Sequence, residues 1–246
     1  MTTESTSHPA LAADEVLATT RCVRSGLDLA RPVARELIEE CVELALQAPS
    51  GSNIQNAHFV VVTDPEMRRA LGDVYRRGWQ AYVESPWFFG KLAYDDYRQQ
   101  PGQIERFAQW AQMATQQVDW LVEHMHEVPV LVVPCVAVGE GVARSIYEES
   151  GVTRETPLPF GVTHAATYGN VLPAATQFRL AARARGLGSS WTVVHLFYEK
   201  DAADVLGIPY ETVIQSALIP VAHASADEFH VAQRPPLSDV LHWDAW

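Results

Sequence analysis

The sequence has few cysteines, and their number and positions exclude several classes of site. Only three occur among 246 residues, at Cys22, Cys41 and Cys135. No two of them have the spacing of a metal site or a redox motif. A small, odd number far apart in sequence is typical of a protein from a reducing compartment. The cysteines therefore give no sign of a disulfide framework or a zinc site.

Long hydrophobic runs are also missing. The longest apolar stretches, such as residues 128–138, are far shorter than the roughly 20 residues that a membrane-spanning helix needs. The first 13 residues are polar and lack the basic segment followed by an apolar run that marks a secretory signal. We therefore expect a cytoplasmic protein with no membrane partner.

Positive charge is scarce relative to negative charge. The chain carries 18 Lys and Arg against 30 Asp and Glu, a formal net charge of −12. Nucleic acids and anionic membranes both reward clustered basic residues, so this balance argues against either as the main partner. An anionic ligand would need a local basic cluster that acts against the average field of the molecule.

Several common site motifs are absent as well. There is no P-loop, no H-E-x-x-H and no nucleophile elbow. A dinucleotide fingerprint is not formed either, because Trp191 stands where the third glycine after Gly186 and Gly188 would be. His124 and His126 are two residues apart, which places them on one face only in a strand, whereas this stretch reads as a helix end. We therefore predict no metal site.

The apolar pattern predicts alternating helices and strands in one domain. Between Leu37 and Ala48, apolar residues recur at steps of three and four, which indicates one face of a helix. Residues 58–63 are apolar and β-branched, which predicts a buried strand. We further expect a disordered tail over 1–13, a single domain over 14–246, two or three helices between 66 and 126, strands over 129–138, 189–195 and 212–221, a short helix and a loop over 141–165, and helices over 168–185 and 200–206.

Two arginines three residues apart form the first candidate site. Arg21 and Arg24 flank Cys22 and Val23, and in a helical turn they would point the same way. Guanidinium groups bind phosphate oxygens in a bidentate, charge-assisted manner, so the pair is a candidate phosphate clamp. The alternative is a solvated helix end whose arginines pair with some of the many carboxylates.

A polar turn between the first long helix and the first strand is the second candidate. Residues 48–56 read A-P-S-G-S-N-I-Q-N and place hydroxyl and amide groups at close intervals. Such a turn suits the polar edge of a flat heterocycle or a sugar-alcohol chain. The alternative is an ordinary turn whose Ser and Asn side chains cap backbone groups.

The third candidate follows the long Ala-rich helix. Gly186 and Gly188, with Ser189 and Ser190 next, would let the backbone approach a ligand closely. The alternative is a helix C-cap that leads into a strand, which the two glycines explain well. A single late arginine, Arg234, precedes Pro235-Pro236-Leu237 and is uninformative alone.

Taken together, these motifs resemble the nitroreductase family. The family's R-S-x-R element matches residues 21–24, and its A-P-S-x-x-N-x-Q element is intact at 48–55. The helix ending in G-L-G, the later L-G-I-P and the arginine before P-L are also present, so the resemblance spans residues 21–241. It implies an α+β fold, with a central mostly antiparallel sheet flanked by helices, in an interlocked homodimer with two FMN sites.

The resemblance also implies which residues bind FMN. The phosphate and ribityl side would be held by arginines and Cys22, and the ring by the polar turn and the glycine-serine stretch. The cofactor-binding set is Arg21, Cys22, Arg24, Pro49, Ser50, Ser52, Asn53, Gln55, Gly188, Ser189, Thr192 and Arg234. Aromatic residues of the middle segment are weaker candidates for the substrate pocket: Tyr94, Tyr97, Phe107 and Trp110. In this family the cofactor carries the chemistry, so no catalytic residue is predicted.

The sequence departs from the family pattern at a few positions. Cys22 replaces the usual Ser and would weaken one phosphate hydrogen bond, because a thiol is a poor donor. Asn56 and Ala57 replace the usual Pro-Trp, which would reshape the pocket wall. Gly26 stands where an aromatic residue is common, and Ala222 where Gly usually follows the last strand. None of these changes removes a phosphate arginine.

The resemblance implies an FMN-dependent, ping-pong oxidoreductase. NAD(P)H would be the co-substrate, and a small acceptor such as a nitroaromatic or a quinone would then take the electrons. Two alternatives remain. The first is a flavin-dependent dehydrogenase or oxidase that acts on a biosynthetic intermediate. The second is a non-catalytic protein that stores FMN.

Overall fold

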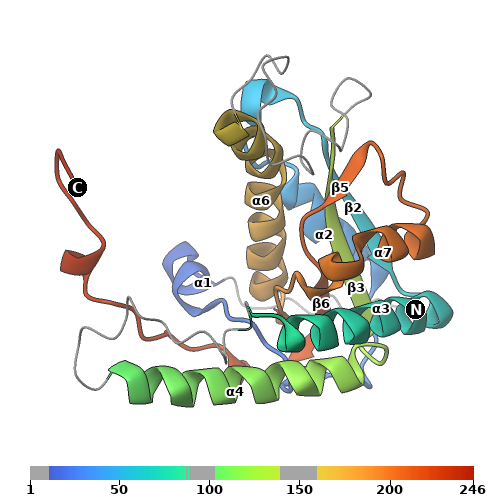
Figure 1. The fold of residues 1–246 in the computed structure, drawn as a ribbon, viewed down its shortest axis with the longest axis horizontal. Coiled ribbons are helices and arrows are strands. Elements are labelled where there is room, and N and C mark those ends of the chain that lie inside the picture. Colours follow the sequence, from blue (N-terminus) through green and yellow to red (C-terminus); the bar gives the residue numbers. More distant parts are fainter. Residues whose placement is uncertain (1–10, 87, 89–102, 139–159) are drawn as a thin grey trace, which may run out of the picture.

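The computed structural model describes residues 11–86, 88, 103–138 and 160–246. Six strands and six α-helices are assigned within these ranges (Figure 1). The helices are α1 (Ala13–Thr19), α2 (Arg35–Ala45), α3 (Pro65–Glu84), α4 (Gln103–His124), α6 (Phe160–Ala184) and α7 (Glu199–Leu206). The strands are β1 (Leu27–Asp28), β2 (Ala57–Val62), β3 (Val130–Ala137), β4 (Leu187–Ser189), β5 (Val213–Gln215) and β6 (Ile219–Ala224).

The strands form one antiparallel sheet. Its order is β1-β6-β3-β2, with β4 joined to β6 and β5 joined to β3. Every pairing between named strands is antiparallel; in the central pair, for example, Val60 lies opposite Val133. The expectation of an α+β fold with a mostly antiparallel sheet is therefore confirmed for the part of the chain that is described.

The central strand β3 is buried on both faces, which explains its uninterrupted apolar sequence. Successive side chains of a strand point to opposite faces. Leu131, Val133 and Cys135 therefore contact one core, while Val130 and Val132 contact another. The first core is completed by α3, α4 and α7, and the second by α2 and α6. The sheet thus lies between two helical layers.

Helix boundaries follow recognisable local signals. Asp64 caps α3 by accepting hydrogen bonds from the backbone N–H groups of Glu66 and Met67, and Pro65 occupies the first turn. α7 ends at Leu206, and the C-cap residue that follows, Gly207, is left-handed at φ 65°. α6 continues through Pro173, which has no N–H to donate to the Gly169 carbonyl one turn earlier.

Several predicted elements need correction. α6 begins at Phe160, so the end of the predicted loop over 141–165 is helical, while residues 139–159 lie outside the described part. Of the strand predicted over 189–195, only Ser189 lies in a strand, β4, and a 3-10 helix begins at Val194. The strand expected over 212–221 is two strands, β5 and β6. Of the predicted disordered tail, residues 1–10 lie outside the described part.

The division of the last strand has a local cause. β5 pairs with β3 beyond Pro134, and β6 pairs with β3 before it. Pro134 has no N–H to donate to a ladder. Its carbonyl instead accepts hydrogen bonds from the backbone N–H and the hydroxyl of Ser216, both at 2.9 Å. The chain therefore changes its pairing at this proline.

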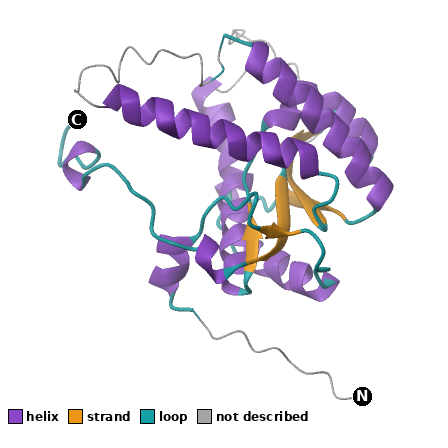
Figure 2. Cartoon of the chain, turned by 90° about the horizontal axis from the view of Figure 1, so that it is seen from below, coloured by secondary structure: helices purple, strands orange, loops and turns teal. Residues whose placement is uncertain are grey.

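The C-terminal segment leaves the body of the molecule (Figure 2). Residues 233–246 are all exposed, and the side chains of Trp243 and Trp246 are 80% and fully exposed. Segments with large exposed apolar groups mark surfaces that contact something else. Among the described residues, none of the helices has the length and apolar character needed to cross a membrane.

Candidate functional site

The segment of residues 21–24 is fixed against the sheet in an extended conformation. The helical turn predicted for it is therefore wrong, because α1 ends at Thr19. Cys22 forms an isolated parallel bridge with Ser189, and the backbone N–H of Val23 donates to the Ser189 carbonyl at 2.9 Å. Val23 is 1% exposed and anchors the segment in the core. The flanking side chains are consequently held in place by tertiary contacts.

A fourth arginine, Arg179 on α6, reaches the same segment. Its Nε donates to Ser189 Oγ at 3.1 Å, and one terminal nitrogen donates to the Arg21 carbonyl at 2.9 Å. The same nitrogen lies 3.5 Å from Cys22 Sγ. Sequence reasoning missed this residue, and its only signal was a charged side chain within an Ala-rich helix. We call Arg21, Arg24, Arg179 and Arg234 the arginine cluster.

Arg21 and Arg234 bring two like charges together. Partial burial and the nearby Arg234 guanidinium both lower the pKa of Arg21 from its ordinary value. Arg21 donates to three backbone carbonyls, those of His230, Thr20 and Ala18. A guanidinium has five N–H donors, so two remain for another acceptor. Adjacent cations in a chain of net charge −12 are the arrangement expected of an anion-binding pocket.

Two polar atoms beside Cys22 have no nitrogen or oxygen partner among the described residues. One is Arg24 Nε and the other is Ser190 Oγ, and both atoms are buried. Arg24 also lies within electrostatic range of Tyr75, whose hydroxyl is 3.2 Å from Thr192 Oγ1. Buried donors without partners are uncommon in proteins and call for an explanation. An anion bound at this position would supply the missing acceptor.

Gly188 allows close packing of the strands beside the arginine cluster. A Cβ atom added there would lie 2.7 Å from Ala224 Cβ and 3.0 Å from Leu27 Cδ2. Its α-carbon therefore faces protein atoms from β1 and β6. The close approach that the sequence predicted at this glycine is to neighbouring strands in the structure.

The loop of residues 49–55 forms the second group of predicted residues. Ser52, Asn53 and Gln55 all have positive φ angles, of 52°, 54° and 51°. Non-glycine residues rarely adopt this conformation, so three within four positions represent concentrated backbone strain. Ser50 Oγ accepts from the Gln55 N–H at 3.1 Å, and Gln55 Nε2 donates to Asn53 Oδ1 at 3.0 Å. Strain of this kind is characteristic of ligand-binding loops.

α6 connects the loop to the arginine cluster. Asn170 Oδ1 accepts from the Gly51 N–H at 2.6 Å, and a cavity of about 250 Å³ lies beside this contact. Asn170 and Arg179 are nine residues apart on the helix, which separates the two groups by about 14 Å along its axis. The structure thus brings together Arg21, Cys22, Arg24, Ser189, Thr192 and Arg234, and places the loop residues Pro49, Ser50, Ser52, Asn53 and Gln55 further along α6.

The predicted substrate-pocket residues lie outside the described part. Tyr94 and Tyr97 belong to the segment of residues 89–102, which the structure does not describe, and the side chains of Phe107 and Trp110 on α4 are not described either.

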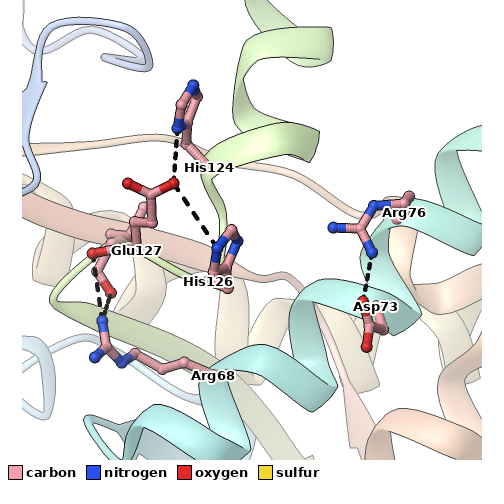
Figure 3. Close-up of polar contacts among 7 residues, drawn as sticks. Arg68, Asp73, Arg76, His124, His126 and Glu127 are labelled. Atoms are coloured by element: carbon pink, nitrogen blue, oxygen red, sulfur yellow. Dashed lines mark hydrogen bonds and ion pairs between the residues drawn. The ribbon is translucent and has the colours of Figure 1, made fainter.

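The two histidines weighed as metal ligands, His124 and His126, do lie within the described residues (Figure 3). His124 Nδ1 lies 3.0 Å from Glu127 Oε1, and His126 Nε2 lies 3.8 Å from the same oxygen. No group of three or more potential metal ligands occurs among the described residues.

The fold and the site together define an α+β protein in which arginines gather beside Cys22 and Ser189. Comparison with known families is more specific: a model described as "Nitroreductase family" matches residues 17–223. The chain belongs to the nitroreductase family. This membership supports the general class of flavin oxidoreductases.

Solved structures share the fold at low sequence identity. A BluB-like flavoprotein from Clostridium difficile 630 superposes with a TM-score of 0.65 at 19% identity, covering 96% of this chain and all of that one. The FMN- and NADPH-dependent nitroreductase NfnB from Sphigopyxis sp. strain HMH gives a TM-score of 0.61 at 21% identity, with the same coverage. Nitroreductase A from Vibrio parahaemolyticus RIMD 2210633 gives 0.62 at 16% identity, covering 95% of this chain and 75% of that one.

Proposed function

We propose that this protein is an FMN-dependent oxidoreductase that takes electrons from NAD(P)H and passes them to a small acceptor such as a nitroaromatic or a quinone. The observation that carries the proposal is the arginine cluster, which gathers positive charge in a strongly acidic chain. Family membership and the flavin-binding neighbours of the same fold support the choice of cofactor.

The arginine cluster fits a phosphate monoester. Arg24 Nε and Ser190 Oγ are buried donors without a nitrogen or oxygen partner among the described residues, and Arg21 keeps two further N–H groups after its three carbonyl contacts. Charge-assisted hydrogen bonds of this type are roughly twice as strong as neutral ones. In the proposed complex, Arg21, Arg24 and Arg234 hold the phosphate, while Arg179 holds the backbone of residue 21 in place.

The ring of the flavin would be oriented by backbone and amide groups. Residues 188–192 contact the arginine cluster at Ser189, whose hydroxyl accepts a hydrogen bond from Arg179. The Thr192 hydroxyl is hydrogen-bonded to the Tyr75 hydroxyl. Ser50, Asn53 and Gln55 supply the hydroxyl and amide groups of the loop. When bound, FMN would supply the electron-transfer chemistry, and these residues would bind and orient it. No described residue is required as a general acid or base.

We further propose that the working unit is a homodimer. The loop of residues 49–55 is largely exposed, and so is the C-terminal segment with Trp243 and Trp246. A second copy of the chain would bury these surfaces and bring its loop toward the ring. Analytical ultracentrifugation of the full chain is expected to give a dimer. Deletion of residues 237–246 is expected to shift the equilibrium toward monomer, and an unchanged monomer in both samples would contradict the proposal.

Stopped-flow mixing tests the proposed reaction. The FMN-loaded protein is mixed anaerobically with NADH or NADPH, and the visible flavin absorbance is followed. We expect rapid bleaching with at least one nicotinamide, followed by recovery of the absorbance when a quinone or nitroaromatic is added. Absence of bleaching with both nicotinamides would reject the reductase. The flavin of a dehydrogenase would instead bleach with that enzyme's own organic substrate. The flavin of a storage protein would bleach neither with a nicotinamide nor with an organic substrate.

A further inference from the structure

We propose that Cys22 is a reactive thiol that forms a mixed disulfide with anionic low-molecular-weight disulfides, and that this modification and FMN binding exclude each other. The second half of this inference rests on the proposed function. The first half depends only on the surroundings of the sulfur, and the two halves are tested by separate measurements.

A fixed cation faces the sulfur. Arg179 lies 3.5 Å from Cys22 Sγ, and the guanidinium is held by Ser189 Oγ and the Arg21 carbonyl. Cys22 itself is exposed. A thiolate beside a positioned cation and open to solvent is the recurring environment of reactive cysteines.

A buried hydroxyl gives a second, independent indication. Ser190 is fully buried, and its Oγ has no nitrogen or oxygen partner among the described residues, so the Cys22 sulfur is the group that its hydroxyl faces. Arg24 Nε is a second buried donor without a partner near the same sulfur. Together these two buried donors can stabilise negative charge at Cys22 or on a group attached to it.

The balance of these effects favours the thiolate. Desolvation by the surrounding protein, taken alone, would raise the pKa of Cys22. Arg179, the backbone N–H of Trp191, Arg24 and Ser190 act in the opposite direction, and the net result is a pKa below the ordinary value. The thiolate is the nucleophilic form, so its fraction at neutral pH rises as the pKa falls.

The other two cysteines form an internal control. Cys41 and Cys135 are both buried, at 0% and 1% exposure. Burial raises the pKa of Cys41 to about 11 and that of Cys135 to about 12. Structural cysteines of this kind are inert in the folded protein. One of the three thiols is therefore expected to react with a disulfide in the native state.

The reaction is an ordinary thiol–disulfide exchange. Cys22 loses its proton to solvent, and its sulfur attacks one sulfur of the disulfide. A new S–S bond forms at Cys22, the S–S bond of the reagent breaks, and one thiolate leaves with the electron pair. Cys22 is oxidised, and the departing half of the reagent is reduced. The arginine cluster favours a reagent with carboxylates, since the rest of the chain repels anions.

Thiol titration tests the reactive cysteine. The purified full chain is treated with dithionitrobenzoate, an anionic disulfide, and the released thiolate is followed by absorbance. We expect one thiol per chain to react in the native state and three after denaturation. Cys22→Ser should remove the native reaction, while Cys41→Ala should keep it. No native reaction in the parent, or a native reaction that persists in Cys22→Ser, would overturn the proposal.

Charge variants test the role of the cation. Arg179→Gln is expected to slow the native reaction by about tenfold, within the range that electrostatic steering produces. Arg77→Gln, at an exposed ion pair with Asp201, is the matched control and should leave the rate unchanged. High salt should slow the parent more than Arg179→Gln, because the variant has lost the cation nearest to the sulfur. Equal rates in the two variants would overturn the role of Arg179, provided circular dichroism shows both are folded.

Protection experiments test mutual exclusion. Added FMN should slow the labelling of Cys22, and protein already labelled there should bind FMN at least tenfold more weakly until a reductant restores it. Labelled and unlabelled protein with the same FMN affinity would overturn the exclusion. FMN titration of the unlabelled protein tests the proposed function separately. A chain that labels at Cys22 but binds no FMN would support the reactive thiol and reject the cofactor.

Discussion

The two groups of predicted cofactor residues differ in how the chain holds them. Three members of the arginine cluster, Arg21, Arg24 and Arg179, are fixed within one chain, because residues 21–24 bridge to Ser189 and Arg179 donates to both segments. The loop of residues 49–55 is mostly exposed, and its main tertiary hydrogen bond is from Gly51 to Asn170. Three of its residues have positive φ.

This difference separates two ways of building a ligand site. Burial and backbone hydrogen bonds hold residues 21–24 in place, and Arg21 lies within electrostatic range of Arg234. The loop stores backbone strain at an open surface, where a ligand or a second chain would complete it. We therefore expect substitutions in the cluster to act mainly on anion affinity, and those in the loop to act on stability and affinity in opposite directions.

The largest expected effect is on FMN affinity at Arg24. Arg24→Ala removes a donor that has no other partner among the described residues, so affinity should fall by about 10- to 100-fold, or about 1.5–3 kcal/mol. Fluorescence titration of FMN measures it. Arg35→Ala removes an exposed arginine paired with Glu39 and should leave affinity unchanged. Equal losses in the two variants would show that net charge, rather than the cluster, governs binding.

A smaller effect is expected on stability at Gly188. Gly188→Ala forces its Cβ to within 2.7 Å of Ala224 Cβ, and overpacking of this kind costs about 1–3 kcal/mol. Urea denaturation measures the free energy of unfolding. Ala224→Gly in the same chain removes the clash and should recover part of the loss. If the double variant is no more stable than Gly188→Ala, the packing role assigned to this glycine is incorrect.

The smallest effect is expected at Gln55. Its φ of 51° is costly for a side chain of this type, so Gln55→Gly should raise the free energy of unfolding by up to about 1 kcal/mol. The same variant should bind FMN more weakly, because it removes the amide. Thermal unfolding and FMN titration give the two readouts. If the variant is less stable and binds FMN as tightly as the parent, the loop is not part of the FMN site.

Much of the fold was predictable because local signals agreed with tertiary ones. β3 is apolar throughout because it is buried on both faces. α7 is followed by Gly207, whose left-handed conformation favours glycine. Residues 189–195 show where this agreement fails. Thr192, Val193 and Val194 favour a strand, but the chain turns into a 3-10 helix and packs its Val194 carbonyl against Gly78 of α3. A single sequence does not encode that contact locally.

The site was predictable to a similar degree. The motif resemblance identified the nitroreductase family, which the family comparison confirmed. Arg179 was not found, because its partners are 10 and 158 residues away in sequence and no motif contains it. The strain at residues 52, 53 and 55 was hidden as well, because Ser, Asn and Gln are also common in relaxed turns. The assignment of individual residues to FMN stays a prediction.

A direct comparison of FMN with riboflavin tests the central claim most clearly. The two ligands share the ring and the ribityl chain and differ by the phosphate, so their affinity ratio isolates the arginine cluster. Fluorescence titration of the flavin-free chain should show FMN bound at least about 100-fold more tightly, as expected from two or more charge-assisted contacts. Equal affinity for FMN and riboflavin would contradict the account.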